Sequence, residues 1–226
     1  MEGLRRVLLK EGQRVLFQGD SATDAGRDRE DFFGLGNGYP AIISGLVGAA
    51  YPGLRIDFLN RGVGGDRVKD LRERWKADCI DLSPDWISIL VGVNDCWRLY
   101  DSNNKTEPVI FERDYRYLLE PVTAIGASSI IMEPFFLPLR GEMEFWAEDL
   151  GPKIQIIRRL AREYEAIYIP LDGIFASAAT MREQGFWAED GVHPSRELII
   201  THMMFSGSHL IISWFLTKTL DAECQR

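Results

Sequence analysis

The chain has 226 residues, 26 of them Lys or Arg against 34 Asp or Glu, and therefore a formal net charge of −8. This length fits a single α/β domain over residues 1–226, which buries enough apolar surface to fold without a metal ion or disulfide. A hydrophobic content of 46% excludes disorder as the main state. The acidic balance argues against a nucleic-acid binder, because such a protein needs a basic face.

Short apolar runs alternate along the chain with longer segments of mixed polarity. The apolar runs predict strands at residues 15–17, 56–59, 86–91, 130–132 and 167–169. The intervening segments predict helices at residues 38–51, 66–82, 111–125 and 150–166. This alternation is typical of βαβ units on a parallel sheet, so we expect a three-layer α/β/α sandwich.

The C-terminal region contains a long uncharged stretch. Residues 198–217 include no Asp, Glu, Lys or Arg and are long enough to cross a bilayer. The same stretch contains His202, His209, three serines and two threonines. We therefore expect a C-terminal helix that covers the sheet and no membrane span.

The cysteines and the N-terminus bear on cellular location. Cys79, Cys96 and Cys224 are few, odd in number and without C-x-x-C spacing, which argues against a disulfide framework or a zinc site. The first residues have no continuous apolar core and no cleavage site of the kind a signal peptide needs. We expect a cytoplasmic protein.

Four polar or glycine-rich segments mark the expected functional edge of the sheet. Ligands of open parallel sheets bind outside the carboxyl ends of the strands. Three of the segments directly follow predicted strands and the fourth lies late in the chain: residues 19–21, 60–66, 92–95 and 190–194. Together they contain the parts of a serine hydrolase.

Ser21 is the candidate nucleophile. A serine hydroxyl is a poor nucleophile and needs an adjacent base. A position between a strand end and a helix exposes the hydroxyl and turns the Ser21 N–H toward an incoming oxyanion. The alternative is that Ser21 only caps a helix in a Gly-Asp-Ser turn.

His193 is the candidate base, with Asp190 three residues before it. This spacing lets the carboxylate accept a hydrogen bond from Nδ1 and leaves Nε2 free to take the serine proton. The alternative is a surface histidine without a catalytic role. His202 and His209 lie in the apolar C-terminal stretch, and we expect them to be packing or helix-surface residues.

Two further residues are candidates for an oxyanion hole. Gly65 follows another glycine after a strand, where the missing side chain lets a backbone N–H approach substrate. Asn94 ends the third predicted strand and can donate a side-chain N–H. Either residue could instead be an ordinary turn residue at a strand end.

These segments resemble the four sequence blocks of the SGNH hydrolases, also called the GDSL esterase/lipase superfamily. The match extends in order and spacing along nearly the whole chain. The resemblance implies a flavodoxin-like sandwich with five parallel strands, catalytic residues Ser21, Asp190 and His193, and no cofactor. It also implies that the N–H groups of Ser21 and Gly65 and the Asn94 amide form the oxyanion hole.

Residues 23–27, 34–39 and 94–98 are similar to bacterial members that resemble acetyl xylan and acetyl-carbohydrate esterases. The resemblance implies hydrolysis of short-chain, mainly acetyl, esters through an acyl-enzyme. Trp97 and Trp187 suit stacking on a sugar or capping a small acyl pocket, with core packing as the alternative, and Asp20 is a further candidate for substrate binding. A thioesterase, a lysophospholipase and a non-catalytic binding protein are the other hypotheses.

One feature departs from the family pattern. A Gly-His pair usually follows the His-Pro-Ser segment and opens the last helix, but residues 196–199 are Arg-Glu-Leu-Ile. A similar sequence arrives later, at residues 206–212. This tail leaves apolar surface that suits a homo-oligomer interface.

Overall fold

Five short strands form the centre of the molecule in the computed structural model, which describes residues 8–139 and 141–195. They are β1 (Arg14–Gly19), β2 (Asp57–Asn60), β3 (Trp86–Leu90), β4 (Ser128–Met132) and β5 (Ile167–Ile169). Every neighbouring pair is parallel and the strand order is β2-β1-β3-β4-β5. The predicted five-stranded parallel sheet is confirmed.

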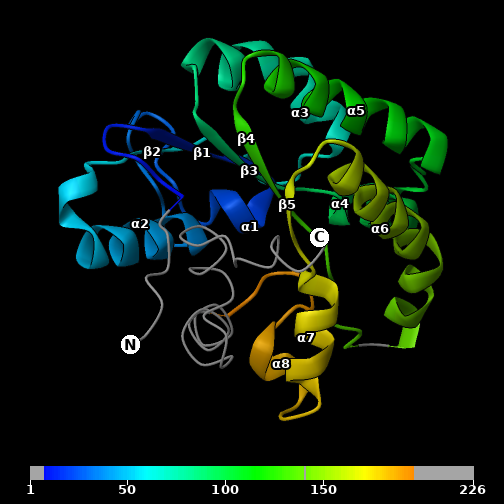
Figure 1. Cartoon of the computed structure of the whole chain (residues 1–226). Helices are drawn as coiled ribbons and strands as arrows, with labels where there is room; N and C mark the ends of the chain where they lie inside the picture. Colours follow the sequence, from blue (N-terminus) through cyan, green and yellow to red (C-terminus); the bar gives the residue numbers. More distant parts are fainter. Residues whose placement is uncertain (1–7, 140, 196–226) are drawn as a thin grey trace, which may run out of the picture.

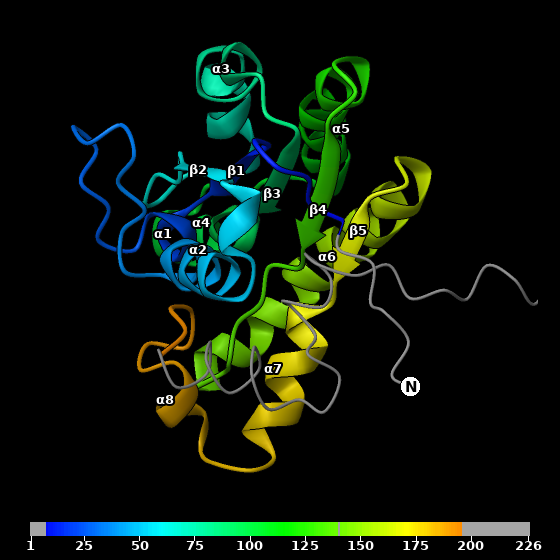
Figure 2. The same cartoon turned by 60° about the vertical axis from the view of Figure 1, so that its left-hand side comes forward.

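Helices cover both faces of this sheet, as Figures 1 and 2 show. One face is covered by α3 (Val68–Asp78), α5 (Pro108–Ala124) and α6 (Trp146–Glu163). The other is covered by α2 (Tyr39–Ala50), α7 (Leu171–Ala179) and α8 (Gln184–Trp187). The result is the predicted α/β/α sandwich.

The alternation of side chains along each strand produces two separate cores. In β1, Val15 and Phe17 are buried beneath α2 and α7, whereas Leu16 is buried beneath α3 and α5. All five residues of β3 are buried, as expected for a strand covered on both faces. Trp75 of α3 fills the second core, and its Nε1 donates to the Leu118 carbonyl of α5 at 3.0 Å.

Some elements differ from those predicted. The helix expected over 66–82 begins at Val68 and ends at Asp78, followed by a 3-10 turn over Ile80–Leu82. The helix α4 (Val93–Ser102) was not predicted, because Asn94 and Asp95 are typical strand-ending residues. Nor was α7, which begins directly after the short strand β5. The helix expected within 198–217 lies outside the described residues. No helix in the described part of the chain is long and apolar enough to cross a membrane.

The order of the strands creates a crevice at one edge of the sheet. The chain moves from β1 to β2 on one side and to β3 on the other, so connections leave the carboxyl ends of β1 and β3 in opposite directions. Gly19 of β1 is paired with Leu90 of β3 at this point. The residues that follow these two strands therefore meet at the crevice.

We expect Gly19→Ala to destabilise the protein strongly. A Cβ at Gly19 would lie 2.1 Å from the Leu90 carbonyl oxygen and 2.4 Å from Thr23 Oγ1. The backbone would have to shift, and overpacking of this kind costs about 1–3 kcal/mol. Gly45→Ala in α2 is the control: no atom lies within 4 Å of its Cβ position, and the change should be neutral or stabilising. Urea denaturation measures both, and equal stability of the two variants would contradict the expectation.

Candidate active site

Ser21 lies at the start of a one-turn helix, α1 (Ser21–Asp24), two residues after β1. Asp20 is the N-cap of this helix and its Oδ1 accepts a hydrogen bond from the Ala22 N–H at 3.1 Å. The cap fixes the turn that presents the Ser21 side chain at the carboxyl edge of the sheet. Ser21 thus has the position expected of an exposed nucleophile, and the capping role of the alternative interpretation belongs to Asp20 instead.

The structure brings Ser21, His193 and Asp190 together in a continuous hydrogen-bonded chain. His193 Nε2 lies 2.6 Å from Ser21 Oγ, although the two residues are 172 positions apart. His193 Nδ1 lies 2.5 Å from Asp190 Oδ2. This arrangement leaves Nε2 able to accept the serine proton, and Asp190 fixes the imidazole orientation.

Asp190 is held by its own turn. Its Oδ1 accepts hydrogen bonds from the backbone N–H groups of Val192 at 3.0 Å and His193 at 2.8 Å. Burial raises the pKa of Asp190, but these bonds and the His193 side chain outweigh burial and lower the pKa below its ordinary value. Asp190 is therefore a carboxylate, able to stabilise an imidazolium, over the whole range in which a histidine base works.

The turn that carries His193 is fixed to the end of the sheet. The Leu137 N–H donates to the Gly191 carbonyl at 2.7 Å, and the Ser195 N–H donates to the Trp187 carbonyl, also at 2.7 Å. Gly191 has φ +84°, and a Cβ there would lie 2.4 Å from the Leu137 carbonyl oxygen. Only glycine fits this close approach.

The glycine loop after β2 lies beside the nucleophile. A Cβ at Gly64 would lie only 3.7 Å from Ser21 Cβ. Gly65 has φ +89°, and no atom lies within 4 Å of the position that a Cβ would take there, so the space on that side of the residue is open. A backbone N–H at this place can reach a substrate oxygen bound at Ser21.

Asn94 lies at the start of α4 and is 2% exposed. Within residues 8–139 and 141–195, its Nδ2 donates one hydrogen bond, to the Asp66 carbonyl at 3.1 Å. A primary amide carries two N–H donors, so the second is available to a ligand. Arg98 Nη2 donates to Asn94 Oδ1 at 3.4 Å, which orients the amide with Nδ2 toward the glycine loop.

The three further predicted substrate residues have different environments. Trp187 is 4% exposed and lies in the core beneath the sheet, edge-to-face with Phe186. Trp97 is only partly buried, and its ring centroid lies 5.5 Å from that of Trp146. Asp20 is buried, and burial raises its pKa to about 7. His202 and His209 lie outside the described residues.

The structure has a small hollow beside the candidate catalytic residues and a larger groove away from them. A small one, with a free volume of about 10 Å³, is lined by Asp20, Ala22, Leu90, Val93, Pro134, Phe135 and Val192. Its wall includes the immediate neighbours of Ser21, Asn94 and His193, so it borders the candidate site.

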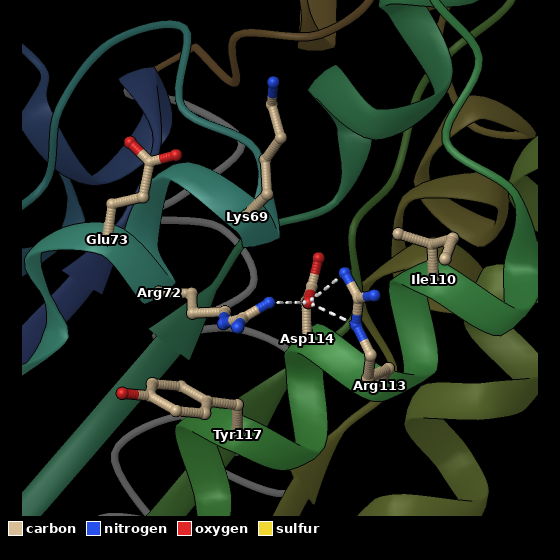
Figure 3. Close-up of a pocket in the computed structure, with 7 residues that line it drawn as sticks. All are labelled: Lys69, Arg72, Glu73, Ile110, Arg113, Asp114 and Tyr117. Atoms are coloured by element: carbon tan, nitrogen blue, oxygen red, sulfur yellow. Dashed lines mark hydrogen bonds and ion pairs between the residues drawn. The ribbon is translucent and has the colours of Figure 1, made fainter.

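A much larger open groove, of about 560 Å³, lies between α3 and α5 on the outer side of one helical layer (Figure 3). None of the catalytic candidates lines it. At its floor, the buried Asp114 carboxylate accepts hydrogen bonds from Arg72 Nη1 at 2.7 Å and Arg113 Nε at 3.0 Å. The volume of a hollow therefore does not mark the site here.

Asp95, whose role the sequence does not predict, is fully buried beside the site. Its Oδ2 accepts the N–H of Val68, the first residue of α3, at 3.0 Å. Burial raises the pKa of Asp95 to about 7, against the hydrogen bond from Val68 and the charges of Lys153 and Arg67. The Asn-Asp pair was interpreted as a strand end, and no local signal shows that the second residue reaches another helix.

Comparison with known proteins places the chain in a family. The family model of the GDSL-like lipase/acylhydrolase family matches residues 17–197. An acetylxylan esterase of Geobacillus stearothermophilus is 32% identical over 213 residues, which cover 88% of this chain and 93% of that enzyme.

Solved structures of similar proteins include further members of this family. A protein of Parabacteroides merdae described as a GDSL-like lipase is 30% identical, with a TM-score of 0.81 and coverage of 93% of this chain and 96% of that chain. Catalytic mutants of the Geobacillus enzyme replace a serine, an aspartate or a histidine with alanine. The serine and aspartate mutants have TM-scores of 0.80 at 30% identity and cover 93% of this chain and 99% of theirs.

The chain therefore belongs to the GDSL-like lipase/acylhydrolase family, as its four sequence blocks predicted. It is a carboxylic ester hydrolase and, within that family, is similar to acetyl xylan esterases.

We expect the Asp95 carboxyl to make stability depend on pH. Its pKa rises from an ordinary 3.8 to about 7 on folding, so its contribution to stability is lost as pH rises through that range. Relative to Asp95→Asn, the wild-type free energy of unfolding should fall between pH 4 and 8, by at most about 1.4 kcal/mol per pH unit. Urea denaturation of both proteins at several pH values measures the difference. A difference that stays constant with pH would contradict the assignment.

Proposed function

We propose that this protein is a serine esterase in which Ser21 is the nucleophile, His193 the general base and Asp190 the residue that orients His193. The observation that carries this proposal is the 2.6 Å contact between His193 Nε2 and Ser21 Oγ. The Geobacillus catalytic mutants support it, because their aspartate and histidine are also three positions apart.

The reaction proceeds in two stages. His193 removes the Ser21 proton as Oγ attacks the ester carbonyl, and the Ser21 and Gly65 N–H groups and the Asn94 amide stabilise the oxyanion. The imidazolium then protonates the leaving alkoxide, which produces an acyl-enzyme. Water activated by His193 hydrolyses this intermediate and restores the free serine.

The small hollow supports a short acyl chain. Its free volume of about 10 Å³ is close to the space for one water molecule or methyl group. Ala22, Val93 and Val192 make its wall largely apolar, which suits the methyl group of an acetyl ester. Longer chains would require the buried Val93 and Val192 to move.

A carbohydrate is the proposed alcohol part of the ester. The relative from Geobacillus stearothermophilus is an acetylxylan esterase, and the partly exposed Trp97 offers an aromatic surface close to Asn94. Trp187 and Asp20 are expected to act from the buried side, through the shape of the site. The alternative is a thioesterase or lysophospholipase with the same triad. A cytoplasmic location and a homo-oligomer remain predictions from the sequence.

Ser21 should be the serine that a fluorophosphonate probe modifies, because only an activated hydroxyl attacks phosphorus quickly. His193→Ala should slow the labelling by about 10²–10⁴-fold, the usual contribution of a general base. Mass spectrometry of the labelled peptide identifies the site. Ser102→Ala, in the nearby helix α4, serves as a control that should label normally. Label on another serine in folded protein would refute the nucleophile.

Acetyl esters should be hydrolysed with a kcat/KM at least about tenfold above butyryl esters, since methylenes that do not fit a pocket cost 1–3 kcal/mol each. Val93→Ala removes part of the wall and should narrow this ratio, whereas Val109→Ala, 72% exposed on α5, should leave it unchanged. Octanoyl esters and acyl-CoA tested in parallel distinguish the alternatives. A preference for either would contradict the short-acyl proposal.

A further inference from the structure

The short segment after the nucleophile, residues 23–27, has no part in the proposed reaction. Asp24 is the last residue of α1, one helical turn after Ser21. Its side chain is 14% exposed and points toward the glycine loop that contains Gly65. The segment therefore lies between the nucleophile and the candidate oxyanion hole.

Asp24 binds the loop directly. Its Oδ2 accepts a hydrogen bond from the Gly64 N–H at 2.9 Å, across 40 positions of sequence. Gly64 immediately precedes Gly65, so this bond fixes the peptide plane next to the proposed donor. Arg29 Nη2 lies 2.5 Å from the same oxygen, and this ion pair holds the Asp24 side chain in place.

Arg27 binds the same loop from the same segment. Its Nη2 donates to the Gly62 carbonyl at 2.9 Å, and its Nε lies 3.7 Å from Asp24 Oδ1. The Arg27 side chain is only 6% exposed, so its guanidinium group makes these contacts while buried. The chain turns back between the two residues because Ala25 and Gly26 have φ values of 29° and 73°.

The loop itself cannot move away from α1 without losing close contacts. A Cβ at Gly62 would lie 2.5 Å from the Asp24 backbone nitrogen, which shows how tightly the two segments fit. Asn60 adds a third link, since its Nδ2 donates to the Thr23 carbonyl at 2.7 Å and its Oδ1 accepts the Gly62 N–H at 2.8 Å. The turn that carries the nucleophile and the loop that carries Gly65 thus form one unit.

We propose that Asp24 and Arg27 are positioning residues, which hold the 62–65 loop so that the Gly65 N–H is aimed at the oxyanion formed on Ser21. The proposal rests on the proposed function, since it assigns a purpose to the oxyanion hole of that reaction. Asp24 holds the loop through an N–H and Arg27 through a carbonyl, so the two bonds fix both its position and its tilt. The oxyanion exists only in the transition state and intermediate, so loss of this alignment affects kcat more than KM.

The test compares Asp24→Ala with Asp24→Asn, and Arg27→Met with Arg27→Lys, on an acetyl ester. Asp24→Ala and Arg27→Met should each lower kcat by about 10–100-fold with KM changed by less than about twofold, as expected for a displaced donor. The conservative variants keep one acceptor oxygen or one donor and should recover much of that loss. Combining Asp24→Ala with Arg27→Met should cost less than the product of the single effects, because both act on one loop.

Asp114→Ala is the matched control, because Asp114 is also a shielded aspartate paired with two arginines, but lies in the groove of Figure 3. It should lower the melting temperature and leave kcat per folded molecule within about twofold. Asn94→Ala is the reference for a lost donor, with an expected fall in kcat of about 10²–10³-fold.

Ser21→Ala separates the two proposals. If it is inactive and folded Asp24→Ala retains a wild-type kcat, the positioning role is refuted and the esterase mechanism stands. If Ser21→Ala retains activity, the proposed function itself fails. If Asp24→Ala does not fold, Arg27→Met decides: a wild-type kcat in folded Arg27→Met refutes the positioning role.

Discussion

The parallel pairing of β1 with β3 at Gly19 and Leu90 is the constraint on which the rest of the site depends. Neighbouring strands lie about 4.8 Å apart, so the residues that follow them start from a fixed separation. Gly19 has φ +157°, and a Cβ there would lie 2.1 Å from the Leu90 carbonyl oxygen, so no larger residue fits at this position. Ser21 leaves one strand and Asn94 leaves the other, which places a hydroxyl and an amide on opposite sides of a single crevice.

Carboxylates that accept backbone N–H groups give the irregular loops around this crevice their shape. Asp190 accepts the His193 N–H, Asp24 accepts the Gly64 N–H and Asp95 accepts the Val68 N–H. Loops have few backbone hydrogen bonds of their own, and a charged acceptor makes stronger bonds than a neutral one. Aspartate is short enough to make such bonds without a large loss of side-chain entropy.

The pKa values of the buried aspartates near Ser21 shift in a different direction from that of Asp190. Burial raises the pKa of Asp20 and Asp95 to about 7, and it also raises that of Asp66. Asp20 and Asp95 therefore carry less negative charge near neutral pH than ordinary aspartates, which reduces repulsion of an oxyanion formed at Ser21. Asp190 differs because its hydrogen bonds outweigh burial, so the negative charge is concentrated beneath His193, where an imidazolium forms.

The sequence alone determined the fold class, the approximate position of all five strands and the four segments that contain the site candidates. Apolar runs such as the one ending at Leu90 are visible locally, because a strand covered on both faces must be apolar throughout. The Asp-x-x-His spacing likewise predicted the contact between Asp190 and His193, since both belong to one turn. The resemblance to the four sequence blocks of the family extended the prediction to residues far apart in the chain, such as Ser21 and His193.

Only the tertiary structure decided which polar side chains bridge these segments. Asp95 looks like a strand end and Asp24 like a helix end, yet each binds a backbone N–H tens of residues away. It also decided that Trp187 is buried in the core while Trp97 remains partly exposed. Local sequence patterns indicate which residues are buried and where turns form. A contact between distant residues depends on how the strands are ordered, and that order is set by the packing of the whole sheet.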